Sequence, residues 1–168
     1  MHSDELRAVQ APLKQRYRDD PATALVTLSA GGNIDAPGVS CRVETGRALV
    51  EAGLHPASGG TGLQACSGDM LLQALVACAG VTLGAVSTSI GFPLRDARLR
   101  AEGDLDFRGT LGVSREAAVG FQAIRLFVEL DTDAPAEERA KLLALTERYC
   151  VVFQTLAKGC PVSVQGGH

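Results

Sequence analysis

The chain has 168 residues and a mass of 17.5 kDa, which predicts one domain, or at most two, with a core of its own. Hydrophobic residues make up 46% of the chain and charged residues 21%, a balance that excludes disordered and fibrous proteins. The formal charge of −3 and the isoelectric point of about 5.6 argue against a partner made of nucleic acid.

The first third of the chain predicts a helix followed by strands. Residues 3–19 are charged and predict a helical extension that breaks or kinks at Pro12. The next residues predict a strand at 22–29, a turn at Gly31-Gly32-Asn33, and strands at 39–44 and 47–51 joined by Thr45-Gly46. A glycine-rich connection follows at 55–62, which lacks the pattern of a phosphate-binding loop and is interpreted as a turn.

Residues 69–89 are apolar on nearly every side, which is typical of a buried helix or of a membrane span. Gln73, Thr82 and the serines near its end keep the uninterrupted apolar run below the ~18 residues that a span needs. We therefore predict a buried central helix and no association with a membrane. One sheet from a chain of this length cannot cover all sides of such a helix, so we expect a second copy of the chain to contribute.

Behind this helix the sequence predicts two strands, a second helix and a last strand, an order that favours an α+β fold. The strands at 93–106 and 120–132 alternate between apolar and polar residues. The second helix is expected to be capped by Asp133, to carry Cys150 on its apolar stripe and to end at Gly159. The remaining expected features are a helix stop at Gly91-Phe92-Pro93 and a short strand at 161–165.

Five cysteines are present, at Cys41, Cys66, Cys78, Cys150 and Cys160. Their odd number and wide spacing differ from the disulfide frameworks of small secreted domains. The first residues show no basic and then apolar region of the kind that directs secretion. We therefore expect a cytoplasmic protein whose cysteines are made as free thiols.

Cys78 lies in the middle of the central helix and Cys150 on the apolar stripe of the second, so packing of the two helices would unite them as a redox pair. The alternative is that both are small buried hydrophobic residues. A thiolate at Cys78 requires a nearby cation, because the dipole of its own helix acts mainly within the first turn. The candidate cations are Arg42, Arg47, His55 and Arg125.

Two further residues have open interpretations. Cys66 lies just ahead of the central helix, where free N–H groups favour a thiolate, or it is an inert loop cysteine. His55 is either a ligand or base, or a loop histidine without a function. Spacings typical of zinc sites, such as Cys-x-x-Cys, are absent from the sequence, and we expect no metal.

Two segments resemble the signatures of one protein family. The segment GGTGLQACSGDMLLQALVACAGVTL resembles the central-helix motif of the OsmC-like family, the osmotically inducible and organic hydroperoxide resistance proteins, with Ala77-Cys78 at its Ala-Cys. The segment AEERAKLLALTERYCVVFQTLAKGCPVSV resembles the second signature, with Cys150 at its cysteine and Val151 where proline is usual. The resemblance covers roughly residues 20–166.

The resemblance implies an α+β fold in which an antiparallel sheet wraps a buried central helix and two chains intertwine as a homodimer. It assigns residues 20–168 to one such domain behind the extension at 1–19. It also implies reduction of hydroperoxides, preferably organic ones, with no metal, flavin or other cofactor. Cys78 would attack the peroxide, Cys150 would resolve the product as a disulfide, and a cellular dithiol would reduce the enzyme.

Two positions depart from the peroxidase pattern. Asn33 continues the turn in which those proteins carry a thiol-activating arginine, and Gly68 stands where they carry a glutamate. Arg42 and Asp69 are the expected substitutes, which makes them candidate catalytic residues beside the two cysteines. The alternative is a dimer of the same fold that binds a small apolar or thiol ligand in its interface cleft without peroxidase activity.

Overall fold

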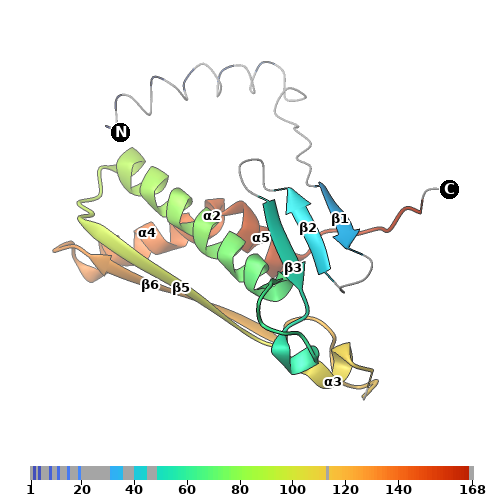
Figure 1. The fold of residues 1–168 in the computed structure, drawn as a ribbon. Coiled ribbons are helices and arrows are strands. Elements are labelled where there is room, and N and C mark those ends of the chain that lie inside the picture. The colour runs from blue at the N-terminus through green and yellow to red at the C-terminus, as the bar shows by residue number, and fades with distance from the viewer. Residues whose placement is uncertain are drawn as a thin grey trace. The chain divides into compact units, whose positions relative to one another are not determined.

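A computed structural model gives the fold of the chain (Figure 1). It describes residues 50–166 apart from Val113 and the side chain of Arg108. Ahead of residue 50 it describes the backbones of 31–35, 40–44 and Leu49, and the isolated positions His2, Asp4, Ala8, Ala11, Gln15 and Asp19. The last five of these are helical and exposed, within the predicted extension, whereas Pro12 and the strand predicted at 22–29 lie outside the described residues.

The early strands form one four-stranded sheet, in the order β1 (Gly31–Asp35), β2 (Ser40–Glu44), β3 (Leu49–Gly53) and β4 (Ala65–Cys66). The first three strands pair antiparallel, which confirms the predicted β2–β3 hairpin, and β4 pairs parallel with β3. The turn predicted at residues 31–33 is wrong, because these residues begin β1. Glycine signals a turn through its flexibility, but pairing with β2 holds both glycines extended.

The connection between β3 and β4 forms a tight turn that fixes His55. The short 3-10 helix η2 (Pro56–Ser58) follows this residue, whose Nδ1 accepts the Ala57 N–H at 3.0 Å. A Cβ atom at Gly60 would lie 1.6 Å from a backbone carbonyl oxygen, so only glycine fits there. The imidazole ring stacks on Phe107, with ring centroids 5.0 Å apart.

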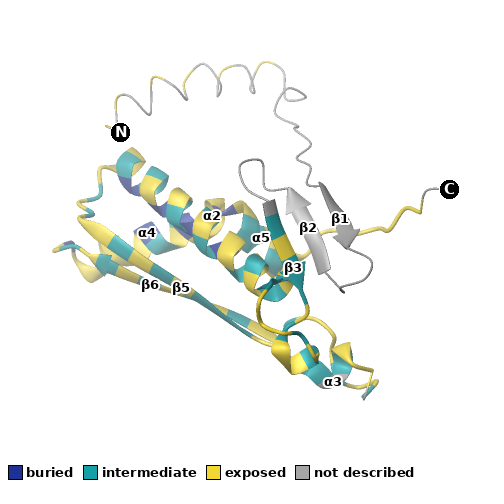
Figure 2. Ribbon diagram, viewed as in Figure 1, coloured by how far each residue is buried: buried dark blue, intermediate teal, exposed yellow. Residues whose placement is uncertain are grey.

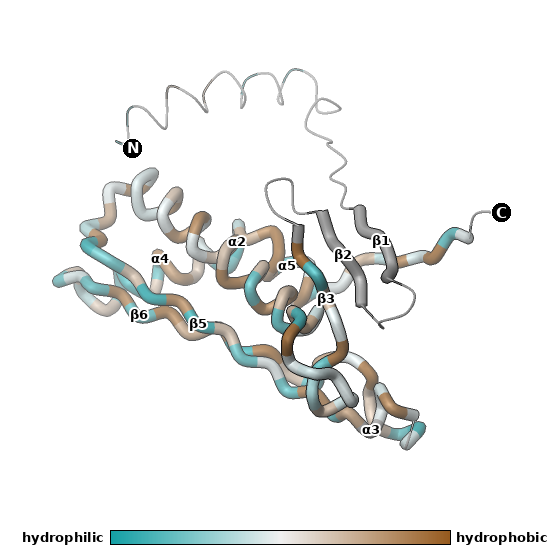
Figure 3. Tube along the Cα trace, in the orientation of Figure 1, coloured by the Kyte–Doolittle hydropathy of each residue, from teal (hydrophilic) through white to brown (hydrophobic). Residues whose placement is uncertain are grey.

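The predicted central helix is confirmed as α2 (Ser67–Ile90), and Gly91, with a φ of 67°, ends it. Its buried residues recur at every fourth position, which marks one face: Leu75, Ala79, Leu83 and Ser87. Figure 3 shows apolar residues along much of the helix, yet Val81 is 75% exposed. A single chain therefore buries one face of α2 and leaves apolar side chains on the rest of the helix exposed to solvent.

The length and composition of α2 would by themselves allow it to cross a membrane, with a mean hydropathy of 1.9 over an 18-residue window. The core helix of a soluble protein passes the same test.

The two alternating segments form a separate two-stranded sheet of β5 (Asp96–Asp104) and β6 (Ala123–Asp131). The predicted alternation of β6 is confirmed: the residues at every second position are the less exposed ones, whereas Phe127, on the other face as predicted, is exposed. The less exposed residues are Ile124, Leu126, Val128 and Leu130. The short helix α3 (Phe107–Thr110) lies in the connection between the two strands.

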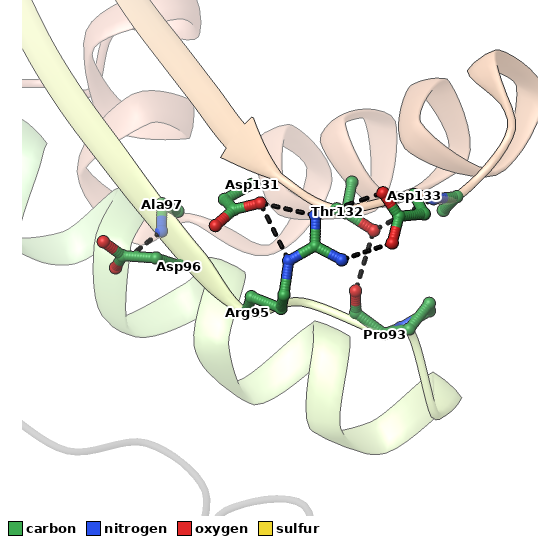
Figure 4. Close-up of polar contacts among 8 residues, drawn as sticks. Pro93, Arg95, Asp96, Ala97, Asp131, Thr132 and Asp133 are labelled. Atoms are coloured by element: carbon green, nitrogen blue, oxygen red, sulfur yellow. Dashed lines mark hydrogen bonds and ion pairs between the residues drawn. The ribbon is translucent and has the colours of Figure 1, made fainter.

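Arg95 joins the chain ahead of β5 to the end of β6. Its guanidinium donates to the carboxylates of Asp131 and Asp133, and its backbone N–H donates to the Asp131 carbonyl at 3.0 Å (Figure 4). The predicted capping role of Asp133 is wrong, since the next helix begins after Pro135 without a side-chain cap. The Asp133 carboxylate instead has a charged partner on Arg95, and hydrogen bonds between charged groups are stronger than neutral ones.

The second predicted helix is two helices, α4 (Ala136–Tyr149) and α5 (Val151–Lys158). Cys150 separates them in an extended conformation, with φ −73° and ψ 110°. No glycine or proline signals this break, but two β-branched valines follow it, and such residues weaken a helix. Gly159, with a φ of 69°, ends α5 as predicted.

The strand predicted at 161–165 is wrong. Residues 159–166 have no regular structure, and Val162 and Val164 are 86% and 97% exposed. A strand needs a neighbour to accept its backbone hydrogen bonds, and the described part of one chain pairs no strand with this segment.

The chain divides into two compact units. The first comprises Met1–Arg7, Ala74–Arg100 and Phe127–His168, and the second comprises Ala8–Gln73 and Ala101–Leu126. The core of the first unit lies on α2 and α4, and Figure 2 shows buried positions on both helices. Leu83 of α2 and Leu142 of α4 are among the largest fully buried side chains. Cys78 and Cys150 both belong to this unit.

Candidate functional site

The first unit brings the thiols of Cys78 and Cys150 together. Cys78 is half-buried in the middle of α2, and Cys150, at the junction of α4 and α5, is 1% exposed. The two thiols are free and lie within hydrogen-bonding reach of each other. The structure thus provides the contact that the redox-pair hypothesis requires.

The first turn of α5 directs two backbone N–H groups at the sulfur of Cys78. These groups belong to Val151 and Val152, the first two residues of the helix, whose N–H groups have no acceptor inside it. The break at Cys150 creates these free donors. The Cys150 thiol also acts as a donor to the Cys78 sulfur, and the Thr82 hydroxyl donates to the backbone carbonyl of Cys78 at 2.8 Å.

Burial and hydrogen bonding act in opposite directions on Cys78. Burial is the largest single influence and raises the pKa of this thiol, because a buried thiolate loses hydration. The hydrogen bonds from Val152, from Cys150, from Val151 and from Thr82 together outweigh burial, so the pKa of Cys78 lies below its ordinary value.

The pKa of Cys150 is shifted in the opposite direction. Burial raises the pKa of this thiol most, and its hydrogen bond and charge repulsion with Cys78 raise it further, against the opposing N–H groups of Phe153 and Val152. Cys78 is therefore the thiol that ionises more readily, and Cys150 keeps its proton. An ionisable thiol beside a protonated one suits nucleophilic attack followed by disulfide formation.

None of the candidate cations is among the groups that shift the pKa of Cys78. The guanidinium of Arg125 is paired with carboxylates of the β5–β6 sheet, those of Asp104 and Glu102. The side chain of Arg42 and the whole of Arg47 lie outside the described residues. Hydrogen bonds from the backbone N–H groups of Val152 and Val151 lower the pKa of Cys78, in the direction in which a cation would act.

The N-terminus of α5 is the part of the site that sequence reasoning missed, because the periodicity predicted one helix running through Cys150. One signal was present. Proline is usual at the position of Val151 in the motif that the sequence resembles, and proline favours the first position of a helix.

Asp69 lines a cavity of about 370 Å³ within the second unit. The cavity is lined by His55, Cys66, Gly68, Asp69, Leu72, Gly103, Asp104, Leu105, Phe107 and Phe121. Phe121 packs so closely on the backbone that a Cβ atom at Gly103 would lie 2.5 Å from its ring. The cavity unites three residues that the sequence singled out, His55, Cys66 and Asp69, and neither Cys78 nor Cys150 lines it.

The remaining cysteines differ in their settings. Cys160 is exposed in the C-terminal segment, and the side chain of Cys41 lies outside the described residues. Within the part of the chain that is described, no three His, Cys, Asp or Glu side chains are grouped to hold a metal ion.

The family model described as "OsmC-like protein" matches residues 60–165, which contain both cysteines of the pair. A comparison with curated protein sequences finds no match.

Solved structures with a similar fold include an OsmC-like protein from Mycoplasma pneumoniae, with a TM-score of 0.66 and 13% identity over 80% of this chain and 89% of that chain. An organic hydroperoxide resistance protein from Legionella pneumophila has a TM-score of 0.62 and 18% identity over 80% and 91% of the two chains. Another from Elizabethkingia anophelis has a TM-score of 0.65 and 15% identity over the same shares. At these identities the likeness establishes the fold.

Proposed function

Because the chain belongs to the OsmC-like family, we propose that it is a thiol-dependent peroxidase that reduces organic hydroperoxides at Cys78. The observation that carries this proposal is the pairing of Cys78, with its lowered pKa, and Cys150, with its raised pKa, at the start of α5. Three of the solved structures with this fold are of organic hydroperoxide resistance proteins, which favours the same substrate class.

In the first step the Cys78 thiolate attacks the terminal oxygen of the hydroperoxide. The O–O bond breaks, the sulfur becomes a sulfenic acid, and the leaving alkoxide takes up a proton to become an alcohol. The sulfur is thereby oxidised by two electrons and the peroxide is reduced. The N–H groups of Val151 and Val152 lower the pKa of Cys78 and so favour the ionised form of the attacking sulfur.

In the second step Cys150, after losing its proton, attacks the sulfenic sulfur. A disulfide forms, and the hydroxide that leaves takes up a proton to become water. A cellular dithiol then exchanges with the disulfide, which returns both thiols and leaves the reductant oxidised. The cycle needs no metal or flavin, and we propose that it runs in the cytoplasm, where such dithiols are maintained.

One equivalent of an organic hydroperoxide such as cumene hydroperoxide is expected to convert the protein to a form lighter by two hydrogen atoms. Intact-mass spectrometry measures this change, and peptide mapping locates the disulfide between Cys78 and Cys150. The Cys78→Ser variant is expected to stay unchanged, whereas Cys160→Ser, at an exposed cysteine, is expected to react like the unmodified chain. A Cys78→Ser variant that oxidises equally fast would refute the peroxidase proposal.

The cavity of the second unit supports a second candidate function, the binding of a small ligand. Its volume of about 370 Å³ and its phenylalanine and leucine walls fit a small, partly apolar molecule. If the protein only binds such ligands, cumene hydroperoxide will leave the mass of the protein unchanged. Cumyl alcohol, which lacks the O–O bond, will then bind as tightly as the hydroperoxide in calorimetry.

We also propose that the protein works as a homodimer built on the open side of α2. Val81, which is 75% exposed and lies opposite the buried face of α2, would be covered by the second copy. The Val81→Asp variant is expected to sediment as a monomer, since a carboxylate in a dry interface costs several kcal/mol. The matched variant Val119→Asp, at a loop valine that is 64% exposed, is expected to keep the dimer. A monomeric unmodified chain would rule this proposal out.

A further inference from the structure

Gln154 makes a hydrogen bond across the break between α4 and α5. Its side-chain amide donates to the backbone carbonyl of Glu147, seven residues earlier in the chain, at 2.9 Å. In an unbroken helix two residues seven apart lie about 10 Å apart along the axis, which is too far for this bond. The bond therefore exists only because the chain leaves the helical conformation at Cys150.

The break takes the ordinary helical donor away from the Glu147 carbonyl. The last regular bond of α4 runs from the Cys150 N–H to the Thr146 carbonyl at 2.9 Å. The next bond of this kind runs from the backbone N–H of Gln154 to the Cys150 carbonyl, also at 2.9 Å. In an unbroken helix the Glu147 carbonyl would accept the N–H of Val151, four residues later. The side-chain amide of Gln154 occupies this acceptor instead.

We propose that Gln154 is a positioning residue that holds the break between α4 and α5 open and so keeps the Val151 N–H at the sulfur of Cys78. A hydrogen bond made in only one of two conformations shifts the equilibrium toward that conformation, and Gln154 makes its bond only with the break. A continuous helix would return the Val151 N–H to the Glu147 carbonyl and take it away from the sulfur. The proposal rests on Cys78 being the reacting thiol of the proposed function.

The pKa of Cys78 supports this role. Burial raises this pKa most, and the N–H groups of Val152 and Val151 are among the donors that lower it. An unbroken helix would bind both groups to carbonyls of residues 147 and 148. The thiolate of Cys78 is therefore favoured by donors that only the break sets free.

Loss of the Gln154 amide changes no charge near Cys78, because this side chain is neutral. The titratable group that acts on Cys78 from the junction of α4 and α5 is the Cys150 thiol. Along α2 itself, no Asp, Glu, Lys, Arg or His follows Asp69 before the helix ends. A change in the titration of Cys78 on loss of this amide therefore reports on the hydrogen bonds at the break.

The test measures the pH dependence of iodoacetamide alkylation at Cys78 by peptide-resolved mass spectrometry on variants of the full chain. Gln154→Met, which keeps the length of the side chain but lacks the donor, is expected to raise the midpoint by about 0.3 to 0.8 pH unit. The matched control is Gln73→Met, at an exposed glutamine of α2. This variant is expected to leave the midpoint unchanged.

A double variant tests the route through Val151. In a continuous helix a proline at this position would clash with the Glu147 carbonyl, so Val151→Pro keeps the break open by itself. Adding Gln154→Met to Val151→Pro is therefore expected to raise the midpoint no further. An equal rise with valine and with proline at position 151 would show that Gln154 acts on Cys78 by another route and would overturn the proposal.

An unchanged midpoint in Gln154→Met would also overturn the proposal, and so would an equal rise in Gln73→Met. If Gln154→Met fails to fold, Gln154→Ala supplies the same loss of the amide. Alkylation requires no peroxide turnover. A shifted midpoint in a protein that does not reduce peroxides would therefore reject the proposed function and keep the role of Gln154.

Discussion

Replacing Cys150 with serine is expected to stop peroxide reduction after one oxidation per chain. Cys78 would still be oxidised to the sulfenic acid, but no second thiol would remain beside it to form the disulfide. The serine hydroxyl can still donate to the Cys78 sulfur, so the first oxidation is expected to keep its rate. Intact mass should show one added oxygen atom, and steady-state turnover with a dithiol reductant should fall to the level of Cys78→Ser.

The Cys150→Ala variant separates the two roles of this residue. It also lacks a second thiol, but in addition it removes a donor to Cys78, so the pKa of Cys78 should rise and the first oxidation should slow at neutral pH. Stopped-flow measurement of the first oxidation distinguishes the two variants. Full turnover by Cys150→Ser would show that another thiol resolves Cys78 and would remove Cys150 from the mechanism.

Replacing Val151 with proline is expected to raise the pKa of Cys78 while leaving the fold intact. Proline has no N–H, so one of the two donors from α5 disappears. Proline is well suited to the first position of a helix, and Cys150 before it is already extended, as the residue before a proline must be. Val151 is 70% exposed, so loss of its side chain leaves no hole in the core.

The size of this effect follows from the loss of one hydrogen bond to an anion. We expect the midpoint of Cys78 alkylation to rise by about 0.5 to 1 pH unit and the rate of the first oxidation at pH 7 to fall by about three- to tenfold. The lowered pKa favours the thiolate at neutral pH, and well above both midpoints the thiol is ionised in either protein. The rates of variant and parent should therefore converge at high pH.

The control for Val151→Pro is Val151→Ala, which shortens the side chain and keeps the N–H. This variant should titrate like the parent, because the backbone donor is unchanged. If alanine and proline shift the midpoint equally, the valine side chain is responsible and the N–H group is not. If neither shifts it, the first turn of α5 does not stabilise the thiolate.

Helices and strands whose apolar residues recur at a regular spacing over a long segment could be predicted from the sequence. Helix α2 and strands β5 and β6 repeat their apolar pattern over nine or more residues, so local disturbances do not hide it. The start of β1 and the capping of α4 could not be predicted in this way. Glycines that read as a turn are held extended by β2, and the carboxylate expected to cap α4 has a charged partner in Arg95.

The sequence identified the two cysteines of the candidate site. It did not reveal the groups that shift their pKa values. The family resemblance singled out Cys78 and Cys150, and the structure places them in contact. The donors that lower the pKa of Cys78 arise from a break in a helix whose apolar period continues through the break, so periodicity alone could not reveal them. Asp69 was chosen by its distance along the sequence from Cys78, and it lines a cavity that holds neither thiol of the pair.

The free N–H groups of Val151 and Val152 also bear on the redox equilibrium of the pair. Whatever stabilises a thiolate stabilises the reduced form of the protein, and it makes that sulfur a better leaving group when the disulfide is attacked. A Cys78–Cys150 disulfide would therefore have a higher reduction potential than a typical structural disulfide. Even a mildly reducing dithiol would then suffice to return the oxidised protein to its starting state.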